Sequence, residues 1–169
     1  DFIHYKNEDL DFYFVRNTTE HWITKILNFR QSNKIPENWD PLTGEITPVI
    51  LYNRDGNYIQ IPYTLPPFGS ALIAFRNGQE KNHFNGISSE SGEQPNLNYS
   101  IHGLELFGDG EYNLSIANKT SKHSPGNKKY ILNTPWKISF PEKLGAPPSL
   151  TLDSLISWTN STIEGVKYF

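Results

Sequence analysis

Apolar and polar residues alternate along most of the first half of the chain, which is the pattern of half-buried β-strands. In residues 10–16 a leucine and two phenylalanines fall on one face of an extended segment, and residues 22–30 repeat the pattern with isoleucine, leucine and phenylalanine. The polar residues 17–20 between them predict a turn. We therefore expect these two segments to pair as a β-hairpin.

Turn chemistry divides the next part of the chain. The Asp-Gly pair at 55–56 lies between the apolar runs 48–53 and 57–63, and this arrangement predicts a second hairpin. Residues 71–75 are apolar on both faces, as expected of a central, buried strand. About six strands at this spacing predict an all-β fold over residues 1–77, namely an antiparallel β-sandwich of the Ig-like or jelly-roll-like type.

The remainder predicts long loops and further strands. Residues 78–98 are rich in Gly, Ser, Asn, Glu and Gln, which indicates a linker or long surface loop, and strands resume over residues 99–169. The polar run 118–129 predicts an exposed hairpin tip or loop. A short strand is expected at 130–132, and the alternating segment 136–140 predicts a strand whose tryptophan, isoleucine and phenylalanine face inward.

Helical turns, by contrast, are expected at one or two places at most. Asp153 is positioned to cap a single turn that holds Leu155 and Trp158. Residues 165–169 are strand-like with no partner after them, and the chain contains no methionine, so we expect a piece of a longer protein. Residues 136–169 are fewer than the roughly 40 that usually fold alone without a staple, so we expect them either to pack on the sandwich or to hang loose in this piece. In the intact protein we expect them to open the next domain.

Composition narrows the classes of function. The chain is 14% aromatic, carries a net charge of −3, and has no basic cluster beyond Lys128 and Lys129. Nucleic-acid binding needs clustered cations, so we expect no nucleic-acid partner. No apolar run approaches the roughly 20 residues that cross a bilayer, so we expect no membrane span. The absence of cysteine rules out disulfides and fits a bacterial protein better than a small eukaryotic secreted module.

The sequence shows no complete catalytic or metal-binding set. A glycosidase needs two facing carboxylates, and the acidic residues here lie mostly in turns that nothing in the sequence brings together. The five histidines stand apart from one another, and the acidic turns 53–57 and 108–111 lack the ligand spacing of an EF-hand. We therefore predict no catalytic residue, no metal site and no cofactor.

Aromatic residues beside turns are the remaining candidates for binding. Residues 38–45 predict a turn in which Asp40 binds backbone N–H groups, Pro41 fixes φ and Gly44 takes a positive φ. Trp39 lies beside this turn, and Trp158 lies beside the predicted helical turn, where a flat ring can stack on the C–H face of a sugar. The alternative is that both rings close an end of the sandwich, since tryptophan is mostly buried.

Several motifs occur in the order and rough spacing found in glycoside hydrolase family 106, a family of large bacterial α-L-rhamnosidases. They are Tyr13-Phe14-Val15-x-Asn17, Phe29-Arg30, Trp39-Asp40-Pro41-x-Thr43-Gly44-Glu45, Leu65-Pro66-Pro67-Phe68-Gly69-Ser70 leading into Phe75, Trp136-x-Ile138-x-Phe140, Leu155-x-x-Trp158-Thr159 and Gly165-Val166-Lys167-Tyr168-Phe169. The chain resembles the C-terminal β-sandwich region of these enzymes, and residues 136–169 resemble the start of a galactose-binding-like domain.

The resemblance implies a non-catalytic role. The catalytic glutamates of such enzymes lie on a (β/α)₈ barrel, and no alternation of strand and helix is present here. We therefore expect an accessory fragment that packs against or spaces the barrel of a periplasmic or extracellular bacterial enzyme. Its expected partners are the rest of that enzyme and a plant or microbial polysaccharide. Two alternatives stay open: an independent carbohydrate-binding module, and a structural or adhesive Ig-like domain.

Overall fold

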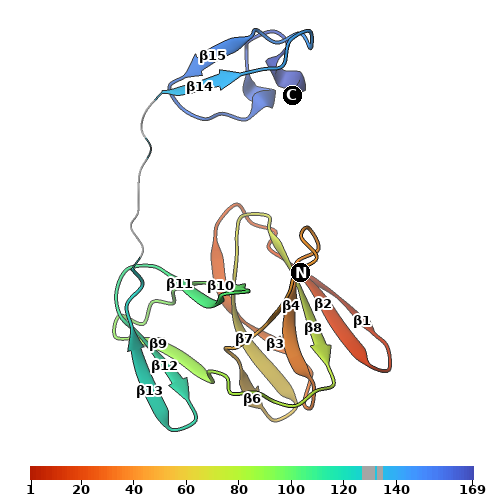
Figure 1. Cartoon of the computed structure of the whole chain (residues 1–169), viewed down its shortest axis with the longest axis vertical. Coiled ribbons are helices and arrows are strands. Elements are labelled where there is room, and N and C mark those ends of the chain that lie inside the picture. The colour runs from red at the N-terminus through yellow and green to blue at the C-terminus, as the bar shows by residue number, and fades with distance from the viewer. Residues whose placement is uncertain (127–131, 133–134) are drawn as a thin grey trace. The chain divides into compact units, whose positions relative to one another are not determined.

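The computed structural model describes residues 1–126, 132 and 135–169. The chain forms two compact units, Asp1–Asn127 and Lys128–Phe169 (Figure 1). Strands dominate both units and pair antiparallel in every sheet, so the predicted all-β fold is confirmed.

The described residues of the first unit form two principal sheets, of five and three strands, and two further sheets, of three and two strands. The strands of the principal sheets are β1 (Phe2–Lys6), β2 (Leu10–Arg16), β3 (Ile23–Phe29), β4 (Ile35–Trp39), β5 (Ile46–Pro48), β6 (Asn53–Asp55), β7 (Tyr58–Leu65) and β8 (Ser70–Arg76). Those of the two further sheets are β9 (Gly86–Ser89), β10 (Asn96–Ser100), β11 (Gly103–Phe107), β12 (Tyr112–Ile116) and β13 (Lys119–His123).

The larger sheet has the order β1-β2-β8-β4-β5, with β8 at its centre. Ile73, Ala74 and Phe75 on β8 are fully buried, which confirms the predicted central strand. The second sheet has the order β3-β7-β6. Its β6–β7 hairpin pairs Asp55 with Tyr58 and turns at Gly56 (φ 57°), so the hairpin predicted from the Asp-Gly pair is confirmed.

The predicted pairing of residues 10–16 with 22–30 is wrong. β2 pairs with β1 and β8, whereas β3 pairs with β7 in the other sheet. The reason lies in Asn17, whose buried side chain donates hydrogen bonds to the carbonyls of His21 and Pro66, both at 2.8 Å. Because the turn is anchored to the segment that joins β7 to β8, it carries the chain from one sheet to the other.

An aromatic cluster joins the two sheets. Tyr13 of β2 contacts Phe29 of β3 and Phe75 of β8, with ring centroids 4.9 and 5.7 Å apart, and the two phenylalanines lie 5.1 Å apart. Ile59 and Ile61 of β7 are fully buried in the same core. Aromatic pairs at these distances stabilise the fold by about 0.5–1.5 kcal/mol each beyond the effect of their buried area.

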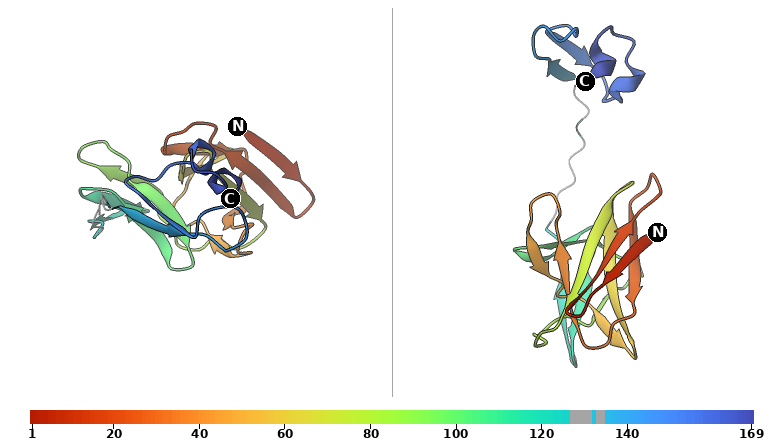
Figure 2. Two further views of the ribbon diagram at one scale, coloured as in Figure 1. Left: turned by 90° about the horizontal axis from the view of Figure 1, so that it is seen from above. Right: turned by 90° about the vertical axis from the view of Figure 1, so that its right-hand side faces the viewer.

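Figure 2 shows the strands of the first unit from two further sides.

Strands also form where the sequence predicted loops. Residues 78–98, expected as a linker or long loop, contain β9, which pairs with β12, and the start of β10. Residues 118–129 contain β13, whose residues are all exposed. The strand expected at 130–132 falls largely on residues outside the described part of the chain.

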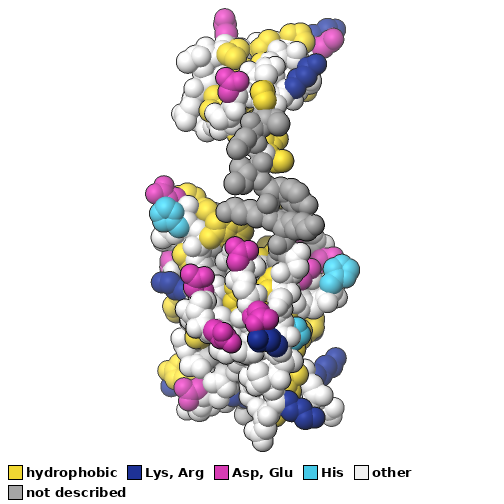
Figure 3. Space-filling view, turned by 90° about the vertical axis from the view of Figure 1, so that its left-hand side faces the viewer, with side chains coloured by type: hydrophobic (Ala, Val, Ile, Leu, Met, Phe, Trp, Pro, Cys, Tyr) yellow, Lys and Arg dark blue, Asp and Glu magenta, His cyan; other side chains and the backbone are white. Residues whose placement is uncertain are grey.

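On the face drawn in Figure 3, acidic side chains are interspersed with lysines and arginines.

The second unit is a small hairpin with two 3₁₀ turns. Its strands are β14 (Trp136–Ser139) and β15 (Ser149–Leu152). Trp136 and Ile138 are half-buried and Phe140 is buried, so the predicted inward face is confirmed. The two 3₁₀ helices, η1 (Trp158–Asn160) and η2 (Val166–Tyr168), agree with the one or two short helical turns expected.

Two details of this unit differ from prediction. Residues 165–169 contain the 3₁₀ helix η2 in place of the predicted strand. Gly165, which precedes η2, takes a φ of 82° and packs so closely on another glycine that an added Cβ would lie 2.0 Å from the Gly145 carbonyl oxygen. Asp153 does not cap the helical turn: η1 begins after Ser157. Among the described residues of the chain, no helix is long and apolar enough to span a bilayer.

A buried carboxylate ties the edge strand β1 to the sheet. Asp11 is 2% exposed, accepts a hydrogen bond from Lys34 Nζ at 2.9 Å, and lies 2.9 Å from His4 Nε2. Burial acts to raise the pKa of Asp11, but the hydrogen bonds from Lys34 and His4 outweigh it and lower the pKa below its ordinary value. The carboxylate therefore stabilises the folded state while it is ionised.

We expect Asp11→Ala to lower the free energy of unfolding by about 2–3 kcal/mol near neutral pH, because the Lys34 ammonium loses a charged partner. Since the folded pKa is depressed, this contribution is complete above the unfolded pKa and disappears as pH falls through the folded pKa. Urea unfolding at about pH 7 and about pH 3 measures both effects. Asp9→Ala, at an exposed neighbour, is the control. An unchanged stability of Asp11→Ala at neutral pH would refute this role.

Candidate functional site

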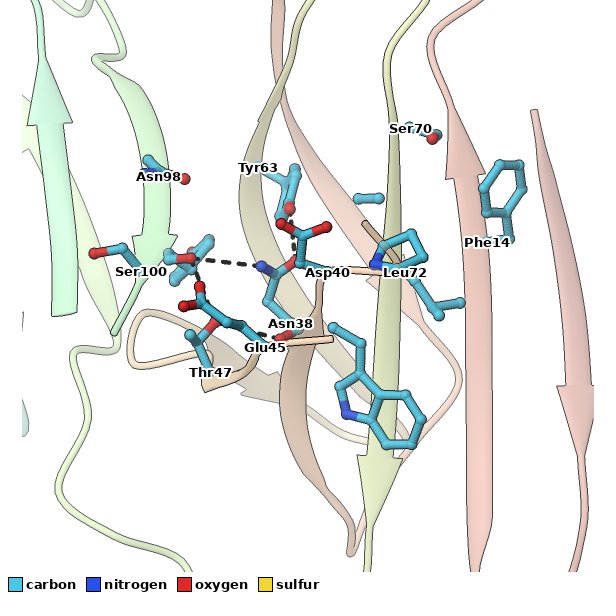
Figure 4. A pocket seen from close by; sticks show the side chains of 14 residues that line it. Phe14, Asn38, Asp40, Glu45, Thr47, Tyr63, Ser70, Leu72, Asn98 and Ser100 are labelled. Atoms are coloured by element: carbon cyan, nitrogen blue, oxygen red, sulfur yellow. Dashed lines mark hydrogen bonds between the residues drawn. The ribbon is translucent and has the colours of Figure 1, made fainter. Parts of the chain in front are cut away.

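A polar cavity of about 320 Å³ lies where β2, β4, β7, β8 and β10 come together (Figure 4). Its size falls in the range of about 300–1,000 Å³ typical of ligand pockets. Its lining consists of Phe14, Asn38, Trp39, Asp40, Pro41, Glu45, Thr47, Tyr63, Ser70, Ala71, Leu72, Asn98, Tyr99 and Ser100.

A hydrogen-bonded network forms the back of this polar cavity. Tyr63 Oη donates to Asn38 Oδ1 at 2.7 Å, and Asn38 Nδ2 donates to the Tyr99 carbonyl at 3.5 Å. Thr47 Oγ1 lies 3.3 Å from the carbonyls of both Asn38 and Tyr99. Burial, with a smaller effect of the Asp40 charge, raises the pKa of Tyr63 to about 12, so its hydroxyl stays protonated. The network holds β4, β5, β7 and β10 in fixed register around the cavity.

The predicted turn over residues 38–45 forms the rim. Asp40 Oδ1 accepts hydrogen bonds from the backbone N–H of Leu42 at 2.8 Å and of Thr43 at 3.4 Å, and Gly44 takes a φ of 76°. The hydrogen bond from Leu42, followed by smaller contributions, lowers the pKa of Asp40 despite some desolvation. Asp40 is therefore a carboxylate at neutral pH.

The structure places two carboxylates beside one cavity, which the sequence analysis did not predict. Asp40 and Glu45 both line the polar cavity, because the turn between β4 and β5 returns on itself through a hydrogen bond from Asp40 N to the Glu45 carbonyl at 2.9 Å. A glycosidase general acid needs a raised pKa, and that of Asp40 is lowered. In the part of the chain that the structure describes, no three His, Asp or Glu side chains cluster to hold a metal ion.

Of the predicted aromatic residues, Trp39 alone lines this cavity. Its indole N–H donates to Glu37 Oε2 at 2.8 Å, and the Arg76 guanidinium lies 5.1 Å from its ring centroid. Trp158 belongs to the second unit, where its ring meets Phe140 edge-on with centroids 5.9 Å apart. The two tryptophans therefore do not form one site within the first unit.

The first unit also has a second, more apolar cavity of about 540 Å³, which the sequence analysis did not predict. It shares Tyr63, Ser70 and Asn98 with the polar cavity. Its other lining residues are Trp22, Thr64, Leu65, Pro66, Asn96, Leu97 and Phe107. The sequence offered no signal for it, because Trp22 and Phe107 look like ordinary strand residues and meet only in the folded chain.

The outer face of the five-stranded sheet carries an unbroken apolar row. Cross-strand pairing aligns one residue from each strand, and we call this set the outer apolar row: Ile3, Phe14, Leu72, Trp39 and Ile46. Ile3 is 68% exposed, Ile46 49% and Phe14 37%. Directly opposed residues project from the same face of a sheet, so these side chains form one continuous stripe.

Comparison with known proteins points to carbohydrate-active enzymes. No family model matches the chain. A protein of Formosa agariphila named "Putative beta-glucuronidase" is 30% identical over 81 residues, which are 47% of this chain and 7% of that protein. The structure of a rhamnosidase from Novosphingobium sp. PP1Y matches 99% of this chain with a TM-score of 0.53 at 23% identity.

The chain is glycoside hydrolase-like in fold. This agrees with the resemblance seen in the sequence motifs. The chain spans 12% of the rhamnosidase and 7% of the glucuronidase relative, so each of these proteins is many times longer than the region it shares. The activity of either relative does not by itself pass to such a short region.

We expect Tyr63→Phe to lower the free energy of unfolding by about 1 kcal/mol, because it leaves the Asn38 Oδ1 acceptor without its donor in a half-buried site. Urea denaturation provides the measurement. Tyr58→Phe, at the exposed start of β7, is the matched control and should change little. Equal stability of the Tyr63→Phe variant and the parent would show that the hydrogen bond does not support the cavity wall.

Proposed function

We propose that this chain is a non-catalytic accessory β-sandwich of a larger α-L-rhamnosidase-like glycoside hydrolase, where it packs against the remainder of the enzyme. The observation that carries the proposal is the outer apolar row on the five-stranded sheet. Antiparallel sheets that face water normally place polar residues on the outer side. An apolar outer face is instead the property of a sheet that another layer covers.

The row continues into a wider apolar surface. Tyr5 of β1 stacks on Phe12 of β2 at 5.1 Å between ring centroids, and both belong to the next cross-strand row. Exposed apolar patches of this kind mark interaction sites. The chain covers only 12% of the rhamnosidase. If the parent protein is similarly long, the rest of the same polypeptide can supply the layer that covers this surface.

Electrostatics supports a role without catalysis. The Asp40 carboxylate is held by backbone hydrogen bonds that lower its pKa. Asp40 therefore acts as a hydrogen-bond acceptor and not as the proton donor that general acid catalysis needs. The catalytic residues of the proposed enzyme then lie outside this chain. The proposal places the enzyme in the periplasm or outside the cell, where plant or microbial polysaccharides are available.

Side-chain footprinting tests the packing. We expect hydroxyl radicals to label Phe14 and Trp39 readily in the isolated chain and several-fold less in the complete gene product, because the partner layer covers them. Tyr58, on the other sheet, serves as the internal control. Equal labelling of Phe14 and Trp39 in both forms would contradict the proposal and would favour a structural domain with no layer on this face.

A charge placed in the row gives an independent test. We expect Phe14→Asp to cost the complete protein about 2–3 kcal/mol more than it costs the isolated chain, because the carboxylate is desolvated only where the row is covered. Thermal unfolding of both forms measures this difference. A cost that is the same in both forms would show that nothing packs on Phe14.

A second candidate function, carbohydrate binding by the first unit alone, is favoured by the polar cavity beside Trp39. The cavity offers an aromatic ring next to hydroxyl, amide and carboxylate groups, which is the combination that sugar recognition uses. The position of Trp158 in the other unit leaves Trp39 as the predicted tryptophan on which this candidate rests.

A further inference from the structure

The polar and the apolar cavities adjoin one another, and we call the pair the groove. Tyr63, Ser70 and Asn98 line both, so the two spaces meet at these three residues. Each cavity is within the size range of a small-molecule site. A ligand that fills both must be longer than one compact group, and its two parts must differ in character because the walls do.

The apolar half offers an exposed aromatic platform. Trp22 is 62% exposed and Phe107 is 43% exposed, while Leu65 and Leu97 in the same lining are buried. Large exposed rings that are held beside a buried apolar floor present flat faces to solvent. The Asn96 and Asn98 side chains border the same cavity, so amides lie beside the rings.

The polar half offers hydrogen-bonding groups that the protein leaves free. Among the described residues, neither the Glu45 carboxylate nor the Ser70 hydroxyl is engaged in a hydrogen bond or ion pair. The Asp40 carboxylate, by contrast, is held by the backbone N–H groups of Leu42 and Thr43 and by the Thr43 side chain. Carboxylates only accept hydrogen bonds, whereas a serine hydroxyl donates and accepts. Sugar hydroxyls satisfy both kinds of group.

The charge of the groove selects among sugars. Asp40 and Glu45 line it, and none of its described lining residues is Lys, Arg or His. A uronate placed here would face two carboxylates with no cation among the described lining residues, and like charges at short range repel strongly where water is partly excluded. A neutral sugar meets no such penalty.

We propose that the groove binds a neutral oligosaccharide, with one sugar stacked on Trp22 and its neighbour hydrogen-bonded to Asp40, Glu45 and Ser70. Uronic acid oligomers are excluded by the two carboxylates. The inference extends the second candidate function. The outer apolar row and the polar half of the groove share Phe14, Leu72 and Trp39, but the two proposals are tested separately, because binding is measured on the isolated chain whereas packing is measured in the complete protein.

Titration calorimetry on the 169-residue chain tests the proposal. The probes are cellotetraose, xylotetraose, mannotetraose, galactotetraose and a rhamnose tetramer as neutral ligands, and tetragalacturonate and its fully methyl-esterified form as a matched charged and neutral pair. We expect at least one neutral tetramer to bind and free tetragalacturonate not to bind. If no neutral probe binds, or if free tetragalacturonate binds as well as the best neutral probe, the proposal is overturned.

Variants locate the binding. Trp22→Ala should lower the affinity for the best neutral probe by about tenfold or more, as expected for loss of a central aromatic contact. Tyr58→Ala should leave this affinity unchanged. Asp40→Asn combined with Glu45→Gln should reduce the difference in affinity between free and methyl-esterified tetragalacturonate. Circular dichroism confirms that each variant is folded. Full affinity in folded Trp22→Ala would place the binding elsewhere and refute the groove.

Discussion

The packing of Tyr13, Phe29 and Phe75 between the two sheets decides the rest of the structure. These rings come from β2, β3 and β8 and meet at 4.9 to 5.7 Å between centroids. Because side chains alternate along a strand, fixing the inner residues fixes the outer ones, and a slip of one residue would exchange the two faces. The outer apolar row of Ile3, Phe14, Leu72, Trp39 and Ile46 is therefore a direct consequence of how the core is filled.

The groove depends on a second anchor at the end of the sandwich. Tyr99 of β10 is buried, donates from its hydroxyl to the Pro62 carbonyl at 2.8 Å, and stacks on Tyr63 at 5.6 Å. Burial keeps the pKa of Tyr99 well above its ordinary range, so the donor is retained. This contact brings Asn98 beside a strand more than thirty residues earlier in the chain and so joins the walls of the two cavities.

Local patterns predicted local structure well. The Asp-Gly turn at 55–56, the buried strand around Ile73 and the capped turn after Trp39 each follow from residues that are close in sequence. The β2–β3 pairing was mispredicted because the decisive contact, between Asn17 and the Pro66 carbonyl, spans 49 residues. The final helical turn was missed for a related reason: Gly165 adopts its φ of 82° because it packs on Gly145, and sequence spacing does not reveal that contact.

The candidate site shows the same division. The turn that presents Asp40 and Trp39 could be predicted, since Asp, Pro and Gly at these positions have known roles in turns. The sequence could not predict that this turn lines the same cavity as Tyr63 and Asn98, because that depends on how β10 packs against β7 in the folded chain. Trp22 was likewise overlooked, because its place in the same cavity lining as Phe107 joins residues that lie far apart in the sequence.

The most direct test of the packing role is an experimental structure of the complete protein, in which the exposed area of Ile3, Phe14 and Ile46 is measured. We expect another layer of the same polypeptide to cover these side chains, which are 68%, 37% and 49% exposed in this chain. A complete protein that leaves all three open to solvent would contradict the role proposed for the outer apolar row.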